Sequence, residues 1–159
     1  VEGDEGSAYS ALLELPNIGI KGLNFEAGMV EQAKKVGSTT SPNRDAKFTT
    51  IGANYTTGPV AFGYNKKEFT NGTSVVALEK KDQDDFGITY TAGNLSYGVL
   101  YQKVDSSIAT KADEKYKAIA LGYNLGPVAA MLNVGKHDNL AGSAGQDADS
   151  ITLKLRTSF

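Results

Sequence analysis

The stretch TYTAGNLSYGVLY, residues 89–101, has the turn dipeptide Gly93-Asn94 between two runs in which large apolar residues alternate with small or polar ones. Alternation with a period of two is typical of β-strands, and a short Gly-containing link between two such runs predicts a β-hairpin. In a soluble hairpin the apolar face packs on a core and the other face meets water. The apolar face here comprises Phe86, Ile88, Tyr90, Leu95, Tyr97, Val99 and Tyr101.

This hairpin pattern recurs along the chain. Each copy has a tyrosine three residues before a turn glycine, and these glycines, Gly58, Gly93 and Gly126, are separated by 35 and 33 residues. The repeating unit is therefore a strand, a tight turn, a second strand and a longer polar connection. The copies are IGANYTTGPVAFGY (51–64), FGITYTAGNLSYGV (86–99) and ALGYNLGPVAAML (120–132), and the predicted connections are 37–46, 70–82, 105–113 and 138–148.

Nine segments show the same alternation, each with one apolar face and one small, polar or charged face. This pattern predicts an all-β fold with nine antiparallel strands. The segments are 9–15, 23–29, 49–55, 60–64, 86–90, 95–101, 119–125, 128–134 and 151–155.

The composition excludes several classes of protein. A length of 159 residues suits one domain, and 40% hydrophobic with 21% charged residues excludes gross disorder. A net charge of −2 excludes the broad basic surface of a nucleic-acid-binding protein. The chain has no cysteine and therefore no disulfide or thiolate metal site. It also has no uninterrupted apolar run of the roughly 20 residues that a membrane-spanning helix needs.

Three features favour a membrane-embedded sheet over a soluble sandwich or barrel. Short turns and long polar connections alternate, which places all tight turns at one end, as in outer-membrane barrels. Four tyrosines near that end predict an aromatic girdle at the membrane interface, and the chain closes on an alternating strand, SITLKLRTSF. A soluble β-barrel or sandwich acting as a binding module remains the alternative. The predicted girdle residues are Tyr55, Tyr90, Tyr97 and Tyr123.

The chain resembles the general diffusion porins of Gram-negative outer membranes, particularly the alphaproteobacterial type. The hairpin repeats carry this resemblance over roughly residues 47–159, and residues 1–46 match more loosely. The ending resembles the C-terminal assembly signal of such barrels, although Thr157 stands where an apolar residue is frequent. The residues that correspond to the signal are Ile151, Leu153, Leu155 and Phe159.

The resemblance implies a water-filled channel in the outer membrane for passive diffusion of ions and small hydrophilic solutes. It implies a homotrimer that contacts outer-membrane lipid and lipopolysaccharide and that the barrel-assembly machinery inserts. It implies neither an enzymatic activity nor a cofactor, and no nucleic-acid partner.

Strand parity extends the interpretation to the whole barrel. With Phe159 at the periplasmic rim, the tight turns face the periplasm and residues 7–15 run inward. Bacterial barrels have even strand numbers, so we expect residues 1–159 to be the C-terminal portion of a single larger barrel domain whose N-terminal strands precede it. The resemblance to general diffusion porins implies that this barrel has sixteen strands and that its constriction loop lies in the preceding part. The alternative is a complete eight-stranded barrel over 22–159, with 7–15 as an extension outside the barrel.

Charged residues on the polar face are the candidates for lining the pore. Lys154 and Arg156 are two residues apart on one strand and share a face, and each would cost about 2–4 kcal/mol on the lipid side near mid-membrane. We therefore predict that both point into the lumen. The complete set of predicted pore-lining residues is Glu14, Asn24, Glu26, Asn65, Gln102, Lys154 and Arg156.

Other polar residues give weaker signals. His137 is the single histidine and is expected at the start of a loop, so neither a catalytic nor a metal site is predicted there. The acidic run Asp82, Asp84 and Asp85 is interpreted as a solvated loop rather than a divalent-cation site. Residues 75–81 fit either a helical turn or a strand.

Overall fold

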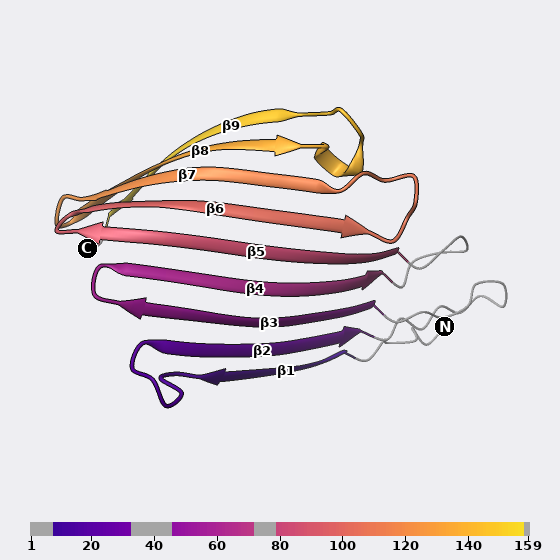
Figure 1. The fold of residues 1–159 in the computed structure, drawn as a ribbon, viewed down its shortest axis with the longest axis horizontal. Coiled ribbons are helices and arrows are strands. Elements are labelled where there is room, and N and C mark those ends of the chain that lie inside the picture. The colour runs from indigo at the N-terminus through magenta and orange to yellow at the C-terminus, as the bar shows by residue number, and fades with distance from the viewer. Residues whose placement is uncertain (1–7, 33–45, 72–78, 158–159) are drawn as a thin grey trace, which may run out of the picture.

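A computed structural model describes residues 8–32, 46–71 and 79–157, and there the chain forms one antiparallel sheet (Figure 1). The strands lie in chain order, each paired with its sequence neighbours, so the predicted all-β fold with nine antiparallel strands is confirmed. The elements are β1 (Ala8–Leu15), β2 (Leu23–Gln32), β3 (Ala46–Thr57), β4 (Val60–Asn71), β5 (Glu79–Ala92), β6 (Leu95–Ser106), β7 (Glu114–Asn124), β8 (Val128–Asp138), the 3-10 turn η1 (Leu140–Gly142) and β9 (Ala148–Thr157).

Tight turns join the strands at one end of the sheet, on the left in Figure 1. Gly58 and Gly93 begin two-residue turns with φ of 55° and 58°. A positive φ at the first central position is what a type II′ hairpin turn requires, and glycine adopts it without a steric penalty. The glycines that marked the repeat thus close the hairpins.

The two described long connections lie together at the opposite end. Asn139 joins them, because its side-chain Nδ2 donates to the Asp113 carbonyl at 2.9 Å while its Oδ1 accepts from the Gly145 N–H at 2.9 Å. The Ala112 N–H also donates to the Gly142 carbonyl at 2.9 Å. The β6–β7 and β8–β9 connections therefore support each other.

The sheet has almost no apolar core. Ala118 is the single buried hydrophobic residue in the described ranges, at 7% exposure, whereas Val99 is 49% and Ile151 76% exposed. The pairing register puts most of the large apolar side chains on one common face, as in the row formed by Ile88, Val99 and Ile119. The exposed apolar side chains on the opposite face are Leu12, Val30, Phe69, Leu100 and Met131. The common apolar face needs an apolar partner, because burial of such surface is worth roughly 25 cal/mol per Å².

The apolar band crosses the strands obliquely. Toward the long connections, the first charged residue on the apolar face is Glu31 on β2, Lys66 on β4 and Lys117 on β7. The register shows how far this border shifts from strand to strand. On β4, Lys66 lies four residues closer to the tight turns than the position in register with Glu31. On β7, Lys117 lies two residues closer to them than the position in register with Lys66. A shift of about one residue per strand corresponds to a strand tilt of about 35°, from a rise of about 3.3 Å and a strand spacing of about 4.8 Å.

Two predicted boundaries need correction. β4 extends to Asn71 and β5 begins at Glu79, so the predicted connection 70–82 is shorter and the acidic run belongs to a strand. Residues 79–81 are likewise strand, and 75–78 lie outside the described residues. Cross-strand pairing explains the difference, since the β4–β5 register continues from Glu68 opposite Asp82 to Asn71 opposite Glu79. Lys80 Nζ also lies 3.6 Å from the Glu68 carboxylate on β4.

The alternative in which residues 7–15 form an extension outside the barrel is wrong for the described part of that segment. β1 pairs with β2 from Ala8 to Leu15, along its whole length. No helix in the described ranges is long and apolar enough to cross a membrane.

Candidate functional site

The polar face of the sheet carries the candidate site. The seven residues predicted to line a pore all stand on this face. One register row crosses β1 to β8 and contains four members of that set, three further polar residues and one glycine. The row reads Glu14, Glu26, Gly52, Asn65, Asp85, Gln102, Tyr116 and His137.

Within this row, a hydrogen bond spans three strands. Asn65 on β4 donates from Nδ2 to the Glu26 carboxylate on β2 at 2.8 Å, across β3. The Thr50 hydroxyl of β3 donates to Asn65 Oδ1 at 2.8 Å. The amide of Asn65 is thereby held with its oxygen toward Thr50 and its NH2 group toward Glu26.

The second part of the site is an ion pair between β4 and β5. Lys67 Nζ lies 2.7 Å from the Asp85 carboxylate, which also accepts hydrogen bonds from Gln102 and Gln83, each at 2.8 Å. The Asp85 side chain is 17% exposed. We call Glu26, Thr50, Asn65, Lys67, Gln83, Asp85 and Gln102 the polar wall network.

Lys67 and Asp85 are functional candidates that the sequence analysis did not place in the lumen. The alternation of side chains along each strand could have identified both residues. Asp85 is two residues from Gly87, and Lys67 is two residues from Asn65, so each shares the polar face with its neighbour. The acidic run is in fact divided, because Asp85 shares the polar face while Asp82 and Asp84 lie on the apolar one. Asp84 accepts a hydrogen bond from the Tyr64 hydroxyl.

Other predicted pore-lining residues lie outside the network. Asn24 Nδ2 donates to Asn54 Oδ1 at 2.8 Å nearer the tight turns. Glu14 is directly opposite Glu26. Lys154 and Arg156 face Met131 and Ala129 on β8 and are exposed. The acidic residues of the predicted set thus lie on β1 and β2, at one edge of the sheet, and its basic residues lie on β9, at the opposite edge.

His137 is in β8 rather than in a loop, which corrects the prediction for this residue. Its ring stacks on Tyr116 with centroids 4.2 Å apart and planes at 26°. Asn133 Nδ2 lies 3.4 Å from the Tyr116 hydroxyl. No cluster of three or more His, Cys, Asp or Glu side chains in the described residues could hold a metal ion.

Aromatic side chains of the apolar face gather toward the tight turns. Tyr90 stacks on Tyr97 with centroids 5.2 Å apart, and Tyr55 meets Phe62 edge-on at 5.5 Å. Tyr123 is opposite Leu95, next to the β5–β6 turn. All four tyrosines predicted for a girdle therefore lie on the apolar face at one end of the strands.

Three of the four residues of the predicted assembly signal lie on β9. Leu153 and Leu155 are 67% and 68% exposed, and together with Ile151 they form the apolar face of this strand. Phe159 lies outside the described residues.

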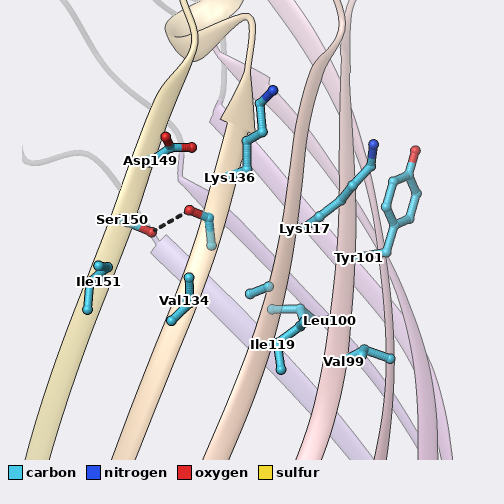
Figure 2. A pocket seen from close by; sticks show the side chains of 12 residues that line it. Val99, Leu100, Tyr101, Lys117, Ile119, Val134, Lys136, Asp149, Ser150 and Ile151 are labelled. Carbon is cyan, nitrogen blue, oxygen red and sulfur yellow. Dashed lines mark hydrogen bonds between the residues drawn. The ribbon is translucent and has the colours of Figure 1, made fainter.

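A shallow hollow of about 650 Å³ marks the border of the apolar band on β6 to β9. Figure 2 shows Lys117 and Lys136 projecting from β7 and β8 above the apolar side chains Ile119 and Val134. Both amines lie near Asp138, at 3.8 and 3.7 Å. Apolar side chains below and amines above suit acyl chains and anionic headgroups respectively.

A sheet with exposed large apolar side chains on one face and hydrogen-bonded polar groups on the other has the pattern of a transmembrane β-barrel wall. The chain matches the model of the Gram-negative porin family over residues 6–156, and it belongs to that family. It is therefore an outer-membrane channel protein of a non-enzymatic class. Comparisons with curated proteins and with solved structures gave no match.

Proposed function

We propose that the polar face of this sheet lines a water-filled channel through which ions and small hydrophilic solutes diffuse passively. The proposal depends on the exposure of the apolar face, which in a soluble sheet would pack on a core. Ile88, Val99 and Ile119 are exposed on this face, while the opposite face presents amides, hydroxyls and charges. Lipid can cover the first face and water the second without leaving either chemically unmatched.

The fixed charges of this face set which ions cross more readily. Glu14 and Glu26 give β1 and β2 a negative wall, and Lys154 and Arg156 give β9 a positive one. In the polar wall network Lys67 neutralises Asp85, whereas Glu26 is bonded to a neutral amide. Charged walls attract counter-ions and repel co-ions, so these residues determine selectivity without binding a solute tightly.

Reversal potentials in planar bilayers under a KCl gradient test this function. Lys154→Gln combined with Arg156→Gln removes two positive charges from the wall, and the reversal potential is expected to move toward the potassium equilibrium potential. The matched control is Lys117→Gln with Lys136→Gln, which removes two positive charges from the apolar face. Equal shifts in both variants, or none in the first, would exclude Lys154 and Arg156 from the ion path.

We further propose that the sheet is the C-terminal part of a larger barrel. Among the described strands β1 pairs with β2 alone and β9 with β8 alone, and unpaired edge groups in lipid cost several kcal/mol each. β1 and β9 run in the same direction because seven strands lie between them in a fully antiparallel sheet. Antiparallel closure therefore takes an odd number of further strands, which a sixteen-stranded barrel supplies.

We propose that the protein assembles as a homotrimer, which the resemblance to general diffusion porins implies. Its partners are outer-membrane lipid, lipopolysaccharide and the barrel-assembly machinery. Lipopolysaccharide would contact Lys117 and Lys136 at the border of the apolar band, and the assembly machinery would contact Ile151, Leu153 and Leu155 of β9. We expect a membrane-bound species that migrates as a trimer on gels until heated. A protein that stays monomeric and soluble without detergent would instead favour the soluble binding module.

A further inference from the structure

We propose that Gly52 is a positioning residue that fixes the Glu26 carboxylate against the channel wall, an inference that rests on the proposed function. Glu26 and Asn65 belong to β2 and β4, which β3 separates. Gly52 of β3 stands between them in the register, opposite Glu26 on one side and Asn65 on the other. Their 2.8 Å hydrogen bond therefore passes over Gly52.

The space above Gly52 is what permits this bond. A Cβ at this position would lie 3.0 Å from Glu26 Oε1, 3.2 Å from Glu26 Cγ and 3.2 Å from Asn65 Nδ2. These distances are below ordinary van der Waals contact, and the atoms approached are the two bridging groups themselves. Gly52 is not among the residues with positive φ, so its role is the absence of a side chain rather than backbone freedom.

Two other glycines of the same face, Gly63 and Gly122, do not share this role. A Cβ at Gly63 would meet nothing closer than Asn54 Cβ at 3.5 Å, and one at Gly122 nothing closer than Ser96 Cβ at 3.7 Å. Both positions could therefore take an alanine at ordinary contact distances. Gly63 is a matched control for Gly52 because it lies on the adjacent strand, faces the same way and touches no charged group.

The bridge determines where a negative charge stands. Glu26 is directly opposite Glu14, and like charges in such a pair repel each other. The Asn65 amide draws the Glu26 carboxylate the other way, toward β4, and Thr50 fixes the orientation of that amide. If the Glu26 carboxylate were displaced from this hydrogen-bonded position, it would project into the channel lumen, where it would attract cations more strongly.

A double-mutant cycle on thermal unfolding in detergent tests the geometry. Gly52→Ala should lower the unfolding midpoint in the wild-type protein and lower it less when Glu26→Ala has removed the atoms with which the new methyl group collides. Gly63→Ala should have the same small effect in both backgrounds. If Gly52→Ala alone folds poorly, recovery of folding on addition of Glu26→Ala also supports the proposal.

Reversal potentials in a KCl gradient test the consequence for ions. Gly52→Ala should shift the reversal potential toward the potassium equilibrium potential, Gly63→Ala should leave it unchanged, and the shift should vanish in a Glu26→Gln background. A purely structural role for Gly52 would not produce a shift that depends on the Glu26 charge.

The outcomes separate this inference from the proposed function. Equal midpoint losses in both backgrounds, or a reversal potential that Gly52→Ala does not move, would overturn the positioning role. A wild-type protein that enters bilayers without conducting would refute the proposed channel and the effect of Glu26 on ions. Even then, a dependence of the Gly52→Ala midpoint loss on Glu26 would show that Gly52 leaves the space for the Glu26–Asn65 hydrogen bond.

Discussion

Asp85 shows how a single carboxylate is stabilised on the polar face. It forms an ion pair with Lys67 at 2.7 Å and accepts hydrogen bonds from Gln83 and Gln102. Because its side chain is 17% exposed, loss of the carboxylate would leave Lys67 without its partner in partly desolvated surroundings.

Asp85→Asn is expected to destabilise the protein by about 1–2 kcal/mol, since it removes a charge-assisted interaction that solvent screens only partly. The measurement is the free energy of unfolding from urea titration in lipid vesicles. Asp149→Asn on exposed β9 is the control and should stay within about 0.5 kcal/mol of the wild type. Equal losses for both variants would contradict a special role for the network.

At the scale of the element, β9 shows how alternation divides one strand between two environments. Leu153 lies at the centre of its apolar face and is 67% exposed, while Thr152 stands on the opposite face across from Asn133. Adjacent residues therefore face lipid and water. The same division holds in β6, where Tyr97 faces outward and Ser96 shares the polar face.

Leu153→Lys should cost about 2–4 kcal/mol of folding free energy in vesicles, as expected for a lysine facing lipid near mid-membrane. Thr152→Lys adds the same charge one residue away and should cost far less, because its amine reaches water. Urea titration in vesicles measures both. Similar costs for the two variants would show that β9 does not separate lipid from water.

The molecule is asymmetric along the strand direction as well as between the two faces of its sheet. Tight turns gather at one end and the β6–β7 and β8–β9 connections at the other (Figure 1). The tyrosines lie near the turns, whereas the charged border of the apolar face lies near the connections. This asymmetry predicts that the turns face the periplasm and the connections face the exterior.

The absence of cysteine makes this orientation directly testable. Ser143→Cys in the β8–β9 connection should react on intact cells with a maleimide too large for the channel. Asn94→Cys in the β5–β6 turn should react only after the outer membrane is permeabilised. The reverse pattern would invert the assigned orientation while leaving the fold unchanged.

The sequence by itself determined the strands, their two faces and the resemblance to porins. Side chains alternate along any extended strand, so the placement of Lys154, Leu153 and Tyr97 on their faces follows from local parity alone. Parity also assigns Asp85 to the polar face, but only once β5 is known to begin at Glu79. That boundary depends on pairing with β4, which is a contact between strands.

Only the tertiary structure decided which polar groups meet. The register brings Glu26 and Asn65 together over Gly52, Lys67 to Asp85, and Tyr116 to His137, although these residues are far apart or on different strands. Register depends on turn geometry and on pairing along whole strands, so no local pattern contains it. The hairpin TYTAGNLSYGVLY thus fixed the faces of the sheet, and strand pairing built the wall network.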